Sequence, residues 1–215
     1  MKQKNAFIAA AALLIAAIAL GVFLFRGQGS AGAPSAAQSQ AALTRTDTPT
    51  FGEPSALVHI VEFLDPACGT CGEFYPFVKK MMAANPGKIR ISVRYAPFHP
   101  GSDQVVKVIE AARMQGQFSQ TLEALFASQS VWVQNHHANV DLIWGPLGAL
   151  GLDLERVKID MNSPEIAQRV QRDLADANSL GVVMTPEFFV NGKPLPSFGY
   201  EQLKTLVDDA LASAK

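Results

Sequence analysis

Residues 57–71 read LVHIVEFLDPACGTC, and this stretch indicates the fold more strongly than any other part of the chain. Its first half, Leu57 to Leu64, is short, nearly continuously apolar and rich in β-branched and aromatic residues, which is typical of a strand buried on both faces. Two cysteines separated by two residues follow, and helical apolar spacing begins after them. The pattern predicts a central strand that leads into a helix through a Cys-x-x-Cys pair.

Cys68 and Cys71 are the only cysteines of the 215-residue chain. Residues three apart on a first helical turn lie about 5–6 Å from one another, a separation that a disulfide can span. Unpaired N–H groups and the dipole at a helix start stabilise a thiolate, so we predict that Cys68 is the nucleophile and that Cys71 resolves the mixed disulfide. A structural zinc would need four ligands, and a disulfide closing so small a loop would add little stability. Redox chemistry is therefore the preferred interpretation.

The segments after the cysteines alternate between helical and strand patterns. Helical spacing continues to Ala84, and residues 89–98 alternate as a second strand. Residues 101–180 are helical with several breaks, residues 182–195 predict two strands around an Asn-Gly turn, and residues 200–212 predict a closing amphipathic helix. This order predicts an α/β, thioredoxin-like fold in which a helical insertion separates a β-α-β half from a β-β-α half.

Two motifs, EFLDPACGTC at residues 62–71 and MTPEFFVNGK at residues 184–193, resemble those of the DsbA-like thiol–disulfide oxidoreductases of the thioredoxin superfamily. The helical block between the motifs is similar to the one that interrupts the thioredoxin core in that branch. The resemblance implies that the two cysteines are the redox pair. It also implies that Pro186 is a cis-proline whose backbone faces the disulfide and pairs with a bound substrate chain, and that Thr185 contributes to selectivity.

Glu62 is a carboxylate inside the predicted central strand. It stands six residues before Cys68, where the resemblance implies a buried acid that handles the proton of the second cysteine. A buried carboxylate without a partner is costly, so its presence in an apolar strand indicates a function. The alternatives are an edge position or an ion pair with a basic residue such as Arg90 or Arg94.

The residues around the cysteines complete the predicted site. We assign Gly69, Thr70 and Thr185 to substrate binding, and Thr70 offers a hydroxyl and a backbone N–H group close to the thiolate. Asp65 and Glu73 flank the pair and are expected to be solvated. We predict no metal site and no cofactor.

The N-terminal segment has the composition of a membrane anchor. Residues 6–25 are apolar and uncharged, with Lys2 and Lys4 before them and Arg26 after them. Twenty residues at 1.5 Å each span about 30 Å, the thickness of the hydrocarbon core of a bilayer. We predict that residues 1–26 form a single-pass anchor in the inner (cytoplasmic) membrane, or alternatively a cleaved signal segment, with the rest of the chain in the periplasm or extracytoplasmic space.

The remaining chain divides into a linker and a catalytic domain. Residues 27–50 are rich in Gly, Ala, Ser, Gln, Thr and Pro, which predicts a flexible linker. Residues 51–215 are expected to form a soluble, monomeric domain. The formal net charge is -1, so no basic field indicates nucleic-acid binding.

These predictions together describe a disulfide oxidase for exported proteins that contain cysteine. The resemblance implies recycling by a DsbB-type membrane redox partner. A membrane-anchored reductase or isomerase is the first alternative, because the Gly-Thr dipeptide leaves the direction open: the histidine found there in strongly oxidising DsbA enzymes is missing. A copper-handling binding protein that uses Cys68, Cys71 and a histidine is the second alternative.

Overall fold

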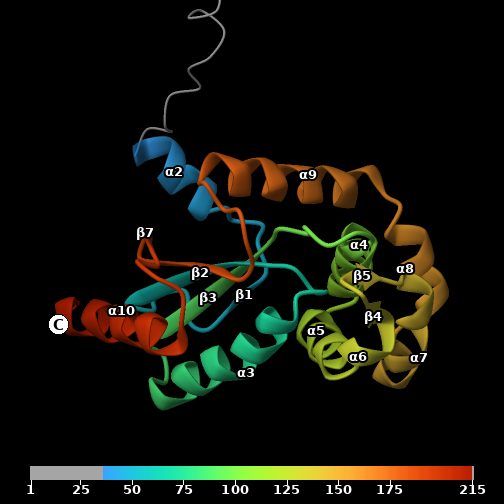
Figure 1. Cartoon of the computed structure of the whole chain (residues 1–215), viewed down its shortest axis with the longest axis horizontal. Helices are drawn as coiled ribbons and strands as arrows, with labels where there is room; N and C mark the ends of the chain where they lie inside the picture. Colours follow the sequence, from blue (N-terminus) through green and yellow to red (C-terminus); the bar gives the residue numbers. More distant parts are fainter. Residues whose placement is uncertain (1–35, 215) are drawn as a thin grey trace, which may run out of the picture. The chain divides into compact units, whose positions relative to one another are not determined.

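The computed structural model describes residues 36–214, which fold around a five-stranded sheet (Figure 1). Its strands, in spatial order, are β1 (Thr50–Phe51), β3 (Ile89–Tyr95), β2 (Val58–Leu64), β6 (Glu187–Val190) and β7 (Lys193–Pro194). β2 and β3 are parallel, and the other three neighbouring pairs are antiparallel. The strand that precedes the cysteines therefore lies at the centre of the sheet, as its apolar sequence predicts.

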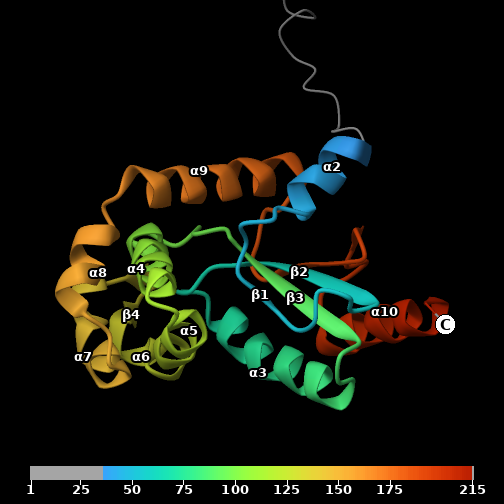
Figure 2. The same ribbon diagram turned by 180° about the vertical axis from the view of Figure 1, so that it is seen from behind.

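Helices cover both faces of the sheet, as Figure 1 and Figure 2 show. They are α3 (Gly69–Ala84) and α10 (Tyr200–Ser213) on one face, and α9 (Pro164–Ser179) with the short α2 (Ala36–Leu43) on the other. Side chains alternate along a strand, so Ile60 of β2 packs toward α3 and α10 whereas Val61 packs toward α9. The same alternation directs Glu62 to the face that α3 covers.

A helical block connects β3 to α9 and lies beside one end of the sheet (Figure 1). It consists of α4 (Ser102–Met114), α5 (Phe118–Ala127), α6 (Gln129–Trp132), the hairpin β4 (Val133–Gln134) and β5 (His137–Ala138), the 3-10 turns η1 (Val140–Leu142) and η2 (Gly148–Leu150), α7 (Trp144–Leu147) and α8 (Leu154–Asp160). Trp132 is fully buried in its core. The thioredoxin-like fold with a helical insertion is confirmed.

The turn between β6 and β7 forms at Asn191 and Gly192, as predicted. Their φ angles are 48° and 81°. Asparagine and glycine tolerate these positive values better than other residues, and two-residue hairpin turns require them. The hairpin fixes the position of β6 beside β2, and β6 follows directly after Pro186.

The second half of the predicted flexible linker differs from the structure. From Ala36 onward the chain belongs to the folded unit, and Ala42 and Leu43 are buried. Arg45 forms an ion pair with Asp176 of α9 at 2.8 Å. Composition predicted a tether because this segment contains few apolar residues, but its partners lie far along the chain and leave no mark in the local sequence.

The predicted membrane anchor, residues 1–26, lies outside the described residues. Within residues 36–214, no helix combines the length and the apolar character needed to cross a bilayer.

Candidate active site

The cysteine pair lies where β2 passes into α3. Cys68 is the N-cap residue of α3, with φ -77° and ψ 118°, and its carbonyl accepts the first helical hydrogen bond from Gly72 N–H at 3.3 Å. Cys68 is 7% exposed and Cys71 is fully buried. The structure holds both as thiols. Only Cys68 is thus accessible to a sulfur atom of another protein.

Hydrogen bonds to its sulfur lower the pKa of Cys68 to about 5, against an ordinary value of 9.0. The Cys71 thiol is the main donor, and the Thr185 side chain and the backbone N–H groups of Cys71 and Thr70 add to the effect, while burial opposes it. At neutral pH Cys68 is therefore a thiolate, the reactive species in disulfide exchange.

Cys71 has the opposite character. Burial raises its pKa well above 9.0, and the hydrogen bond to Cys68 and the charges of Glu62 and Cys68 raise it further. Cys71 keeps its proton at neutral pH until a base takes it. This difference suits Cys68 to attack and Cys71 to resolution, the roles that the sequence predicts.

Glu62 belongs to the central strand β2, and its side chain lies on the face of the sheet that α3 covers. It is 1% exposed, and burial, followed by the charge of Cys68, raises its pKa to about 8. Among the described residues, neither carboxylate oxygen has a hydrogen-bond partner. Glu62 is therefore mostly protonated at neutral pH, and its charge, when present, raises the pKa of Cys71.

The structure differs from both alternatives considered for Glu62. Its position is not at an edge, because it pairs with Val93 of β3 and Phe188 of β6. Arg94 points to the opposite face of the sheet, where it contacts Asp173 and Asp176, each at 2.7 Å. Arg90 lies instead within 3.4 Å of the His59 ring.

The loop before β6 completes the site from the other side. The Thr185–Pro186 bond is cis, as the resemblance implies. When Cys68 is protonated, its thiol donates a hydrogen bond to the carbonyl oxygen of Thr185 at 3.2 Å. Pro186 is buried, and the preceding Val183 and Met184 are exposed. An extended client chain bonded to Cys68 would thus meet backbone groups and apolar side chains of this loop.

Asp65 was expected to be solvated, and this expectation is wrong. It is fully buried, and its carboxylate accepts hydrogen bonds from Ala67 N–H at 2.8 Å, from His99 N–H at 2.8 Å and from the Ser102 hydroxyl. The His99 ring nitrogen Nδ1 lies 2.7 Å from the same group. Asp65 thereby ties the loop before Cys68 to the loop after β3. Glu73, in contrast, is exposed as expected.

Gln129 of α6 also holds this loop, a role that the sequence analysis did not predict. Its side-chain amide donates to the carbonyls of Pro66 at 2.7 Å and Cys68 at 3.0 Å. The helical insertion therefore contacts the redox motif directly. Between the cysteines, Gly69 is exposed and Thr70 is half-buried, which places both at the surface that a client would meet.

The histidines that a copper site would require have other partners. His99 binds Asp65, and its ring stacks on that of His136 at 5.9 Å. His59 contacts Ser92 at 2.8 Å. Within the part of the chain that the structure describes, no group of three or more His, Cys, Asp or Glu side chains is arranged to hold a metal ion.

A thiolate at the start of α3, a buried resolving cysteine and a cis-proline, on a thioredoxin core with a helical insertion, are together the features of the DsbA-like thiol–disulfide oxidoreductases. The chain belongs to the thioredoxin family. The family model described as Thioredoxin matches residues 44–209 of the sequence. The fold and redox site of the chain are those of the thiol–disulfide oxidoreductases.

Solved structures share this architecture. A thioredoxin-like oxidoreductase from Silicibacter pomeroyi is 30% identical, with a TM-score of 0.70 and coverage of 80% of this chain and 98% of that one. Wolbachia pipientis alpha-DsbA1 is 18% identical, with a TM-score of 0.71 and coverage of 82% and 97%. BdbD from Bacillus subtilis is 22% identical, with a TM-score of 0.67 and coverage of 84% and 97%. The last two show likeness of fold alone.

The curated relatives are longer proteins. The Na(+)/H(+) antiporter NhaA of Herminiimonas arsenicoxydans is 34% identical over 144 residues, which are 67% of this chain and 22% of that protein. The Na(+)/H(+) antiporter NhaA 3 of Salinispora tropica is 30% identical over 168 residues, which are 76% of this chain and 25% of that protein. The chain thus spans a quarter or less of the length of these relatives.

Proposed function

We propose that this protein is a disulfide oxidase for exported proteins that contain cysteine. The observation that carries the proposal is the set of hydrogen-bond donors around the Cys68 sulfur, which lowers its pKa to about 5. A stabilised thiolate favours the reduced form of the enzyme over its disulfide. An enzyme with a stabilised reduced form passes its disulfide on to clients and is a strong oxidant.

The donors around Cys68 take the place of the histidine that the Gly-Thr dipeptide lacks. Thr70 supplies a backbone N–H group, Cys71 a thiol and a backbone N–H group, and Thr185 its side chain. Each unit of thiolate pKa corresponds to about 1.4 kcal/mol, or about 30 mV for a two-electron couple. The shift of Cys68 is large enough to favour the oxidase over the reductase.

The reaction proceeds in two exchanges. A client thiolate attacks Cys68 of the disulfide form, the bond to Cys71 breaks, and the departing Cys71 sulfur takes a proton from Glu62. A second client thiolate then attacks the client sulfur of the mixed disulfide and releases Cys68 as the stabilised thiolate. The client loses two electrons and gains a disulfide, and the enzyme pair gains those electrons.

The cellular setting follows from the N-terminal sequence. The apolar residues 6–25 anchor the enzyme in the inner membrane, with the catalytic domain in the periplasm or extracytoplasmic space and a DsbB-type membrane partner reoxidising the pair. A phosphatase reporter fused after Lys215, active only outside the cytoplasm, tests this orientation.

The direction of electron flow is tested by two measurements. We expect the reduction potential against glutathione to lie well above the roughly -270 mV of thioredoxin, and alkylation of intact cells to find the Cys68–Cys71 pair mostly oxidised. A pair that is mostly reduced in cells, with a potential near that of thioredoxin, would instead establish the reductase or isomerase.

A further inference from the structure

Gln129 connects the helical insertion to the backbone of the redox loop, residues 65–68. It is the first residue of α6, and its Nε2 atom donates hydrogen bonds to the carbonyl oxygens of Pro66 at 2.7 Å and Cys68 at 3.0 Å. A side-chain amide nitrogen has two N–H bonds to donate. The loop that ends in the attacking cysteine therefore uses both of them.

The carbonyl group of Cys68 is where this contact reaches the chemistry. Cys68 is the N-cap of α3, with ψ 118°, and its carbonyl oxygen accepts the first helical hydrogen bond, from Gly72 N–H, at 3.3 Å. The side chain of Gln129 donates the shorter of the two bonds to this oxygen. Because ψ of Cys68 sets the direction of the oxygen, a donor that holds the oxygen also holds ψ.

The backbone conformation of Cys68 decides which groups face its sulfur. The backbone N–H groups of Thr70 and Cys71, in the first turn of α3, stabilise the thiolate. They are free to do so because the first N–H groups of a helix have no partner within it, and an extended N-cap residue lies beside them. By holding the Cys68 carbonyl, Gln129 keeps the sulfur next to these donors.

Gly72 allows Gln129 to approach α3 so closely. A Cβ atom added at this position would lie 3.3 Å from Oε1 of Gln129 and 3.4 Å from the ring of Phe126. A larger side chain would push α5 and α6 away from the redox loop. The residue directly after Cys71 thus matches the position of the insertion.

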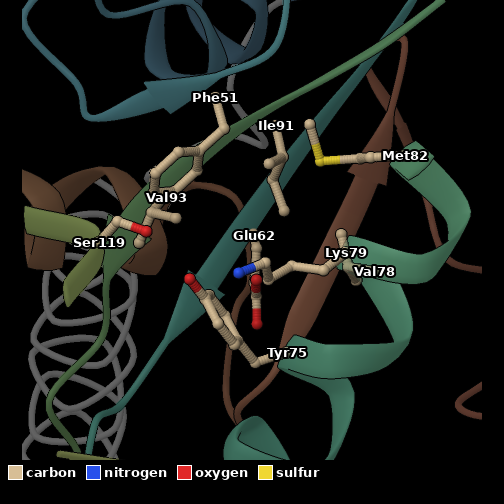
Figure 3. A pocket seen from close by; sticks show the side chains of 9 residues that line it. All are labelled: Phe51, Glu62, Tyr75, Val78, Lys79, Met82, Ile91, Val93 and Ser119. Atoms are coloured by element: carbon tan, nitrogen blue, oxygen red, sulfur yellow. The ribbon is translucent and has the colours of Figure 1, made fainter. Parts of the chain in front are cut away.

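The insertion is also docked on α3 one turn further along. Glu123 of α5 accepts hydrogen bonds from the Tyr75 hydroxyl at 3.1 Å and the Lys79 ammonium at 2.5 Å, and the rings of Tyr75 and Phe126 are 5.4 Å apart. Figure 3 shows Tyr75 and Lys79 extending from α3. These contacts fix the end of α5, and with it the start of α6, relative to the helix that carries the cysteines.

We propose that Gln129 is a positioning residue for disulfide exchange: from the helical insertion it holds the Cys68 carbonyl, and with it the helix start that stabilises the Cys68 thiolate. Gln129 acts through the backbone of Cys68. The proposal rests on the proposed function, because it assigns to the insertion a part of the thiolate stabilisation that makes the enzyme an oxidant.

Substitutions at Gln129 test the proposal in the full-length protein. Gln129→Met keeps the length of the side chain without its donor, and Gln129→Leu is a second variant without a donor. Gln129→Lys keeps a donor. Gln134→Met makes the same change as Gln129→Met at an exposed position of β4, in the same insertion. Near-ultraviolet circular dichroism, to which the buried Trp132 contributes, shows in each variant whether the insertion is folded.

Two quantities are measured: the midpoint of the ultraviolet absorbance of the thiolate against pH, and the equilibrium of the Cys68–Cys71 pair with glutathione. In Gln129→Met and Gln129→Leu we expect the midpoint to rise by about one unit, the size expected for the loss of one or two hydrogen bonds. The glutathione equilibrium should shift about tenfold toward the disulfide form, which corresponds to about 30 mV. Gln129→Lys should titrate at or below the native midpoint, and Gln134→Met should match the native protein in both measurements.

The outcomes separate this role from the function on which it rests. A native midpoint near 5 that is unchanged in folded Gln129→Met or Gln129→Leu would overturn the role of Gln129 and leave the proposed oxidase intact. An equal shift in Gln134→Met, or a midpoint above the native one in Gln129→Lys, would overturn it as well. A native midpoint near the ordinary value of 9.0 would contradict the oxidase and the role of Gln129 together.

Discussion

Cys68 and Cys71 are one helical turn apart, yet they hold their protons over very different pH ranges. The sulfur of Cys68 receives hydrogen bonds at the start of α3, and that of Cys71 is enclosed by apolar groups and lies near the carboxyl group of Glu62. The Cys71 thiol is also the largest stabiliser of the Cys68 thiolate. The resolving cysteine therefore activates the attacking one before it reacts.

The first prediction concerns this activation. The thiolate absorbance of the reduced protein should titrate with a midpoint of about 5. In Cys71→Ala the midpoint should rise by at least one unit, because the main donor is lost. Thr70→Ala, which keeps the backbone N–H group, serves as the control and should titrate like the native protein. An unchanged midpoint in Cys71→Ala would show that the backbone groups alone stabilise the thiolate.

The same shift makes stability depend on pH. The folded pKa of Cys68 is about 5 and the ordinary value is 9.0, so between these values the unfolded chain binds the extra proton. Stability rises with pH wherever the unfolded state binds more protons. The free energy of unfolding of the reduced protein, relative to reduced Cys68→Ala, should thus increase from pH 5 to pH 9 and fall as the pH drops through 5. Denaturant unfolding across this range measures it, and a constant difference would contradict the thiolate assignment.

The roles of the two sulfurs are tested by trapping. Cys68→Ser should abolish disulfide exchange without unfolding the protein. In Cys71→Ser the Cys68 thiolate can still attack client disulfides, which is the reverse of the proposed exchange. Mixed disulfides through Cys68 should then accumulate, because no Cys71 thiol is present to displace the client. Mass spectrometry of the adducts identifies the bonded cysteine. Adducts through Cys71 in Cys68→Ser would reverse the assignment.

Among single residues, the sequence predicted those whose role can be read from their immediate neighbours in the chain. It did not predict those whose role depends on partners far along the chain. The spacing of the cysteines, an acid within an apolar strand and the Thr-Pro motif can all be read within a few residues. Asp65 was misjudged because its partners His99 and Ser102 lie more than thirty residues away. Only the fold brings them together.

At the scale of elements, the loop between β2 and α3 is held from two directions. Asp65 anchors it to the loop after β3, and Gln129 anchors it to α6. The strands and long helices were predictable because their apolar periodicity is strong. The contact between Gln129 of the helical insertion and the loop before Cys68 was not predictable, because a single polar residue shows no periodicity.

The contribution of Asp65 to this loop can be measured. Asp65→Ala leaves several buried donors without an acceptor, so we expect the free energy of unfolding to fall by roughly 2–4 kcal/mol. Glu73→Ala is the matched control, because its carboxylate is exposed, and should change stability by less than about 0.5 kcal/mol. Urea denaturation of both variants provides the comparison. Equal stability of the two would mean that the buried donors find other acceptors.

At the scale of the whole domain, a network of buried ion pairs and hydrogen bonds connects the N-terminal segment, residues 36–45, to β3 and α9. Arg94 of β3 is fully buried and contacts Asp173 and Asp176 of α9, and its guanidinium donates to the carbonyl of Ala42 in α2. Arg45, which is partly exposed, forms a further ion pair with Asp176. Breaking such a network by removing one partner is more costly than losing an exposed ion pair.

The domain should therefore need residues 36–50, which composition alone assigned to a linker. We expect a fragment of residues 36–215 to be soluble, monomeric and active. A fragment of residues 51–215 loses the buried Leu43, the carbonyl acceptor of Arg94 and the ion pair of Arg45. Burial of one leucine contributes about 2 kcal/mol and the lost polar contacts about 1–3 kcal/mol.

The shorter fragment should accordingly be about 3–5 kcal/mol less stable, a large part of the 5–15 kcal/mol typical of a domain. Urea unfolding of both fragments measures the difference, and Arg45→Ala in the longer fragment isolates the part-buried ion pair of Arg45 with Asp176, which should account for about 1 kcal/mol. Equal unfolding midpoints for the two fragments would show that α2 is not part of the cooperative unit. In that case residues 36–50 would belong to the linker, as the prediction of a linker over residues 27–50 has it.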